Sequence, residues 1–145
     1  MYQLLYAKGF VLLAALFAGK NAETVEQRII GRWAFVSITS SKPMVWTPGT
    51  APSKDGTALM QECEKDDFVQ FKPGGVYEEN EGETRCDDSD SPVYTSTWSL
   101  EGSDMMIDGK QYQVVAITDT EMKVAQTVEA GRKNTVTVTV TMKRK

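Results

Sequence analysis

The chain has 145 residues, of which 16 are basic and 20 are acidic, so its net charge is −4, and it contains no histidine. The length favours one domain, and the acidic balance argues against a nucleic-acid partner, because phosphate binding needs a basic patch. Without an imidazole, a Ser-His-Asp triad, a His-ligated haem and the usual catalytic zinc sites are excluded. Two cysteines are too few for a thiolate zinc cage. We therefore expect no cofactor and no enzyme, with carboxylate chemistry as the remaining route to catalysis.

The first twenty residues have the order of a secretory signal peptide. Residues 1–8 carry one lysine, residues 9–17 ("GFVLLAALF") are apolar, and small residues follow. The apolar run is shorter than the ~20 residues that span a bilayer. We therefore predict a signal peptide over residues 1–20 and a domain over residues 21–145. The alternative is an N-terminal helix that packs on the domain.

The mature domain is predicted to begin with a short helix and to continue as strands. Residues 23–30 ("ETVEQRII") have an acidic start that suits a helix N-terminus. Eight segments then show the alternation and bounding turns of strands, namely residues 29–40, 67–72, 76–81, 93–100, 105–107, 111–118, 121–128 and 134–142. An antiparallel meander of eight strands exposes two edges unless it closes. We therefore predict an all-β, eight-stranded antiparallel up-and-down barrel.

One long connection interrupts this regular spacing. Residues 41–61 contain three prolines and two glycines, which break regular elements. We expect this segment to be a loop, with one helical turn near residues 58–62. A loop of this length in a small domain is usually functional or disordered.

The two cysteines flank one predicted hairpin almost symmetrically. Cys63 lies eleven residues before Gly74, and Cys86 lies eleven residues after Gly75. A two-residue turn places the cysteines opposite each other, whereas a three-residue bulged turn shifts the register by one and places Phe71 opposite Tyr77. Both registers allow the sulfurs to bridge, so we predict a disulfide in an exported protein, with two free thiols as the alternative.

An acidic run lies in and after the third predicted strand. It comprises Glu78, Glu79, Glu81, Glu83, Asp87, Asp88 and Asp90. Because charges fall on both faces of that strand, burial of its far end would carry a large desolvation cost. We therefore expect this hairpin to project beyond the barrel into water. The run lacks the spacing and the glycine of a calcium loop, so no metal site is predicted.

The order of several short motifs resembles a known family. Gly31-x-Trp33 resembles the first-strand motif of lipocalins. Together with Cys-x-x-Asp, Phe-x-x-x-Gly-x-Tyr and Thr-Trp-Ser-Leu, it makes residues 29–143 similar to the bacterial lipocalin-like domains common in Bacteroidetes. The resemblance implies an exported or lipid-anchored barrel and little about activity. Lys20 stands where a lipid-anchored member would have an acylated cysteine, so we expect export to the periplasm or the extracellular space without an anchor.

Three residues are predicted to be structural. An aromatic residue beside a glycine on the first strand is usually core, so Trp33 after Gly31 is expected to plug one end of the barrel. The resemblance implies that an arginine near the last strand covers this tryptophan. Arg144, which follows that strand, is better placed for this contact than Arg132.

The predicted function is binding of a small apolar molecule in the barrel or its mouth by a monomer. The predicted contacts are Trp46, Tyr94, Trp98 and Phe35. Trp46 lies in the long loop and is either a lid over the mouth or part of the core, and the spacing of the other three also fits simple core. The alternative function is a periplasmic inhibitor or assembly factor that binds a basic protein through the acidic hairpin.

Overall fold

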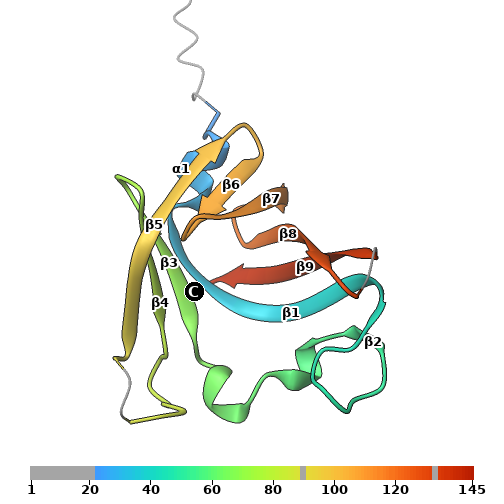
Figure 1. The fold of residues 1–145 in the computed structure, drawn as a ribbon. Helices are drawn as coiled ribbons and strands as arrows, with labels where there is room; N and C mark the ends of the chain where they lie inside the picture. Colours follow the sequence, from blue (N-terminus) through green and yellow to red (C-terminus); the bar gives the residue numbers. More distant parts are fainter. Residues whose placement is uncertain (1–21, 89–90, 132–133) are drawn as a thin grey trace, which may run out of the picture.

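The computed structural model describes residues 22–88, 91–131 and 134–145 (Figure 1). The predicted signal peptide, Asp90 and Arg132 lie outside the described residues. The described chain forms one short helix, two single 3₁₀ turns and nine strands. These are α1 (Val25–Ile29), β1 (Gly31–Met44), β2 (Ser53–Asp55), η1 (Thr57–Leu59), η2 (Glu62–Glu64), β3 (Phe68–Lys72), β4 (Val76–Asn80), β5 (Val93–Glu101), β6 (Asp104–Ile107), β7 (Lys110–Ile117), β8 (Glu121–Glu129) and β9 (Thr135–Arg144).

The barrel closes because β1 pairs with strands on both of its sides. Residues Gly31–Ala34 pair with β3, and residues Trp33–Ser40 pair with β9. The strands from β3 to β9 are neighbours in sequence order, and all pairs are antiparallel. Eight strands therefore form a ring, which confirms the predicted barrel. The ninth strand, β2, lies outside the ring and pairs with the far part of β1.

The long connection is more regular than predicted. The first strand continues past Ser40 to Met44, and β2 pairs with it through Thr39 opposite Asp55 and Met44 opposite Ser53. The prediction that residues 41–61 form a loop is therefore wrong for residues 41–44 and 53–55, which are strand, whereas the expected helical turn lies close to η1 (Thr57–Leu59). Pro43 is tolerated because the register of this pair shifts between Thr39 and Met44, and proline in a sheet is confined to edges and bulges.

The acidic hairpin does not project from the barrel. Strand β4 pairs along its whole length with β3 and with β5, and Asn80 at its far end has a partner on each side. The expectation of a projecting hairpin is therefore wrong. The physical reason is that the barrel is open at this end, so Glu79 remains exposed to water although its strand is part of the ring.

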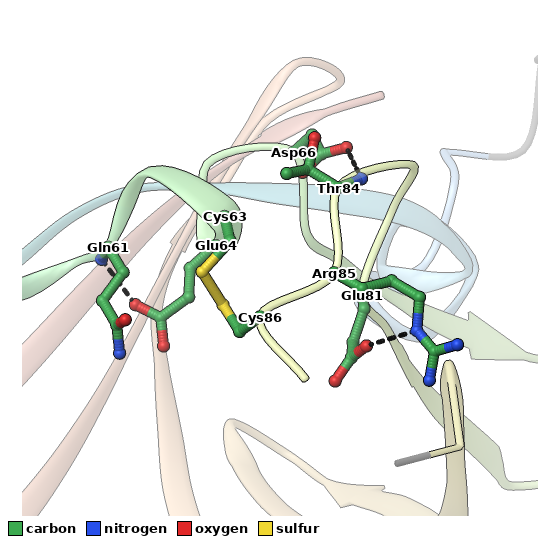
Figure 2. Close-up of a disulfide and its surroundings, with 8 residues drawn as sticks. All are labelled: Gln61, Cys63, Glu64, Asp66, Glu81, Thr84, Arg85 and Cys86. Carbon is green, nitrogen blue, oxygen red and sulfur yellow. Dashed lines mark hydrogen bonds and ion pairs between the residues drawn. A yellow bond between two sulfur atoms is a disulfide. The ribbon is translucent and has the colours of Figure 1, made fainter. Parts of the chain in front are cut away.

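The predicted disulfide is present between Cys63 and Cys86, with a Cα–Cα distance of 5.2 Å (Figure 2). Phe71 lies opposite Tyr77, which is the register of the bulged three-residue turn. The bridge joins η2 to the segment that follows β4. Asp66 supports the same segment, because its Oδ2 accepts hydrogen bonds from the backbone N–H groups of Glu83 and Thr84.

Trp33 plugs the end of the barrel at which α1 lies. Its side chain is fully buried, and its indole Nε1 donates a hydrogen bond of 2.8 Å to the carbonyl oxygen of Ile29. Arg144 covers the ring, with its guanidinium carbon 4.4 Å from the ring centroid. The guanidinium also donates to the carbonyl oxygens of Arg28 and Ile30, so it ties the helix to the last strand.

Gly31 makes this arrangement possible. Its φ is +136°, a value that side-chain-bearing residues rarely adopt, and a Cβ there would lie 2.5 Å from Nη1 of Arg144. The glycine of the Gly-x-Trp motif is therefore required for backbone conformation and for the approach of the arginine.

Replacing Arg144 by Ala is expected to lower the free energy of unfolding by about 1–2 kcal/mol, because charge-assisted hydrogen bonds and a cation–π contact are lost together. Urea denaturation followed by tryptophan fluorescence measures the change. The exposed neighbour Lys143 provides the control, and its replacement by Ala should change the stability much less. Equal effects of the two substitutions would show that the guanidinium contacts contribute nothing specific.

Candidate ligand-binding site

The open end of the barrel lies opposite the end plugged by Trp33. In an up-and-down ring, successive connections alternate between the two ends. The β1–β3, β4–β5, β6–β7 and β8–β9 connections therefore share the end opposite α1, and Figure 1 shows β2 and the long connection at that end. Three adjoining hollows lie in this region, and Phe35 on β1 lines all of them.

The inner hollow has a volume of about 190 Å³ and an apolar floor. Side chains from β1, β3, β6, β8 and β9 form that floor, namely Phe35, Val69, Phe71, Ile107, Val124, Val140 and Met142. Polar groups complete its wall, namely Tyr77, Glu79, Asp108, Lys110 and Tyr112. This combination of an apolar floor and a few polar groups is typical of small-molecule sites.

Two further hollows extend this space toward the surface. The β4–β5 hollow, of about 260 Å³, shares Phe35, Val69 and Glu79 with the inner hollow and is also lined by Tyr94. The third hollow, of about 190 Å³, lies between β1 and η2, and it shares Asp67 with the β4–β5 hollow. We call the three together the mouth.

Hydroxyl groups orient two carboxylates of the mouth. Asp108 Oδ1 accepts hydrogen bonds from the Ser96 hydroxyl at 2.7 Å and from the Tyr94 hydroxyl at 3.2 Å. Glu79 Oε1 accepts from the Tyr77 hydroxyl at 3.0 Å. Asp108 precedes Gly109 in a two-residue turn in which both residues have positive φ, of 51° and 73°, as expected for an Asp-Gly hairpin.

The mouth is electrically negative around its tyrosines. Burial raises the pKa of Tyr77 far above its usual range, and the negative charge of Glu79 and its hydrogen bond raise it further. Burial also raises the pKa of Tyr112, with further contributions from Glu79 and Asp108. The two carboxylates therefore act on the same part of the inner hollow.

Asp67 has a different environment from its neighbour Asp66. Burial raises the pKa of Asp67, and the charges of Asp66, Glu64 and Glu81 add to the effect. Its Oδ1 is buried without a hydrogen-bond partner among the described residues. In contrast, the N–H groups of Thr84 and Glu83 hold the pKa of Asp66 below its usual value.

The structure brings together two of the four residues predicted to contact a ligand. Phe35 and Tyr94 both line the β4–β5 hollow, and Tyr94 is 50% exposed. Trp98 is 5% exposed, packs edge-on against Phe71 and donates its indole N–H to the carbonyl oxygen of Lys72. It is not among the residues that line the mouth.

Trp46 lies beside β2 and is not among the residues that line the three hollows. Its Nε1 donates a hydrogen bond of 2.9 Å to the carbonyl oxygen of Ser53, and its ring packs so closely on Gly56 that a Cβ there would lie 2.9 Å away. The side chain is half-buried. It therefore holds the long connection together in this structure.

The sequence patterns do not identify the two inner carboxylates of the mouth, Glu79 and Asp108, as ligand contacts. The sequence places Glu79 in an acidic run that is expected to face water, and it marks Asp108 only as part of a turn. Alternation along β4 offers the missing signal, since Glu79 must share the inward face with Tyr77.

Comparison with known proteins places this architecture in a family. The family model described as "Lipocalin-like domain" matches residues 29–124. The chain belongs to this family. Among solved structures, the lipocalin-like chain is similar to one described as "Bovine Odorant Binding Protein deswapped triple mutant", with 12% identity, a TM-score of 0.42, and coverage of 81% of this chain and 74% of that one. No curated protein matches the lipocalin-like chain.

Two further properties of the described residues bear on the site. None of their helices has the length and hydropathy that crossing a membrane would require. Across residues 22–88, 91–131 and 134–145, no group of three or more Cys, Asp or Glu side chains lies close enough together to hold a metal ion.

Proposed function

We propose that this lipocalin-like chain is an exported protein that binds a small molecule, with the apolar part of the ligand in the inner hollow. The observation that carries the proposal is the inner hollow itself, with its apolar floor inside a closed barrel and its polar groups on one wall. Burial of apolar ligand surface supplies affinity, and the wall groups supply orientation. The match of residues 29–124 to the lipocalin-like family is consistent with ligand binding.

Export is supported by the Cys63–Cys86 bond, because disulfides persist in oxidising compartments. The signal-peptide pattern of residues 1–20 and Lys20 in place of a lipidated cysteine support a protein without a lipid anchor. We include in the proposal that the protein is bacterial, that it lies in the periplasm or the extracellular space, and that it acts as a monomer.

The proposed ligand contacts are Phe35 and Tyr94 from the predicted set, together with Val140 and Tyr112 on the floor and wall of the inner hollow. Trp46 and Trp98 would act on the ligand only through the residues that they support. Trp98 packs against Phe71, which lines the hollow.

A basic protein partner has less support than a small ligand. Glu78 forms an ion pair with Lys72, and Glu81 forms one with Arg85 (Figure 2). Part of the acidic run therefore already has intramolecular partners. Binding to a basic protein would weaken steeply with salt, whereas uptake of a neutral apolar probe would not.

Filling the inner hollow is expected to weaken ligand binding strongly. Val140 lines the hollow, and Val140→Phe adds a ring to this space. The neutral fluorescent probe N-phenyl-1-naphthylamine should bind the wild-type protein saturably and bind the variant at least about tenfold more weakly. The control is Val115→Phe, since Val115 on β7 is 58% exposed and is absent from the lining of the inner hollow.

Circular dichroism of each variant checks that the barrel is intact. Equal probe affinity in the two variants, or no saturable uptake by the wild-type protein, would contradict the proposed function.

A further inference from the structure

We infer that the ligand of this barrel is a cationic amphiphile, with its apolar chain in the inner hollow and an ammonium-type head group between Glu79 and Asp108. The inference rests on the proposed function and adds the chemical class of the ligand. Its basis is the distribution of charge and of hydrogen bonds around the mouth.

The first observation is an excess of carboxylates. Among the described residues that line the three hollows, the acidic side chains are Glu64, Asp67, Glu79, Glu81 and Asp108, and Lys110 is the one basic side chain. Arg85 pairs with Glu81 at 3.3 Å, so one of these carboxylates has a cationic partner. The mouth as a whole remains negative.

The second observation is that the two inner carboxylates are held in place and still have free acceptor capacity. Ser96 and Tyr94 both donate to the same oxygen of Asp108, its Oδ1. Tyr77 donates to Oε1 of Glu79. A carboxylate has two acceptor oxygens, so each residue is oriented through one oxygen and can accept from a ligand through the other.

The third observation concerns the outer part of the mouth. Asp67 lines both outer hollows, and its buried Oδ1 has no hydrogen-bond partner among the described residues. A buried acceptor without a partner is costly. Together with Glu64 and Glu81, Asp67 extends the negative charge of the mouth to the two outer hollows.

The electrostatics of the buried tyrosines agree with this geometry. Glu79 and Asp108 both contribute to the raised pKa values of Tyr77 and Tyr112, after the larger effect of burial. The inner hollow therefore experiences the charge of both carboxylates. A cation in it would be attracted, and the carboxylate head of a fatty acid would be repelled.

The spacing of the acidic groups favours an organic cation over a metal ion. No three Cys, Asp or Glu side chains among the described residues converge closely enough to hold a metal. The apolar floor beside Glu79 and Asp108 requires a ligand with a hydrocarbon part. An alkylammonium ion supplies both a hydrocarbon part and hydrogen-bond donors.

Three ligands with the same chain separate the effect of charge from that of burial. Octylammonium, 1-octanol and octanoate are titrated into the full-length protein by calorimetry at pH 7 and low ionic strength. We expect octylammonium to bind at least about tenfold more tightly than octanoate, with octanol between them, and the preference to shrink in salt because the mouth is open to solvent.

Variants that remove either negative or positive charges from the inner hollow test the assigned residues. Glu79→Gln with Asp108→Asn should weaken octylammonium binding about tenfold and leave octanol binding unchanged; asparagine tolerates the left-handed backbone of residue 108. Lys110→Gln should strengthen octylammonium binding. The matched control is Glu129→Gln with Asp104→Asn, which removes the same charge at exposed positions that do not line the three hollows.

The outcomes distinguish this inference from the proposed function. If all three ligands bind with equal affinity, or if the control pair weakens octylammonium binding as much as the test pair, the inference is overturned and the proposed function stands. If neither these ligands nor N-phenyl-1-naphthylamine binds, both fail.

Discussion

Replacing Trp33 by Ala is expected to lower the free energy of unfolding by about 3–5 kcal/mol. The ring is fully buried at the closed end, so its removal leaves a cavity in addition to the loss of buried apolar area. Two groups that contact the indole ring also lose this contact. The carbonyl oxygen of Ile29 loses a hydrogen bond of 2.8 Å, and the guanidinium of Arg144 loses the ring that it covers.

Trp46 provides a matched control for this substitution. Its indole N–H also donates to a backbone carbonyl, at 2.9 Å, but its ring is half-buried beside β2 and outside the ring of eight strands. Trp46→Ala should therefore cost much less than Trp33→Ala. Urea denaturation midpoints measured by far-ultraviolet circular dichroism compare the two variants without depending on tryptophan emission. Similar losses would mean that the closed end has no special role in stability.

The barrel was predictable because local patterns and the global fold agree. Period-two alternation in residues 134–142 and turn residues such as Asp108-Gly109 mark strands and their ends without any long-range information. An open meander would leave its first and last strands without partners on one side, so closure is favoured. The pairing of β1 with β9 closes the sheet.

The features that the sequence did not predict depend on contacts between distant segments. Strand β2 forms because residues 53–55 meet the far part of β1, and nothing within the proline-rich segment signals that pairing. The sequence predicts only that Glu79 faces water. Helix α1, Trp33 and Arg144 close one end of the barrel and thereby decide that the other end is open. The carboxylates at that open end therefore surround a cavity.

The aromatic residues show the same limit. Composition and spacing identify Trp46 and Trp98 as candidates for a site, because large aromatic side chains serve equally well in cores and in ligand contacts. Only the three-dimensional structure shows which residues each tryptophan contacts. Trp98 lies against Phe71, and Trp46 lies against Gly56.

Removing the disulfide is expected to affect both stability and the shape of the mouth. Cys63 and Cys86 have a sequence separation of 23, so the paired substitutions Cys63→Ser and Cys86→Ser should lower the free energy of unfolding by about 3 kcal/mol, because the unfolded chain gains conformational freedom. The segment before Cys86 contains Glu81, which lines the β4–β5 hollow. The variant should therefore also bind a small ligand more weakly.

Denaturation with and without dithiothreitol tests this expectation. Reductant should shift the wild-type midpoint to that of the double variant and should leave the variant itself unchanged, because the variant has no cysteine left to reduce. The wild-type protein should show no free thiol in denaturant without reductant. Two free thiols would refute the bridge. An unchanged midpoint on reduction would instead mean that the contacts of Asp66 with Glu83 and Thr84 hold this segment without the covalent bond.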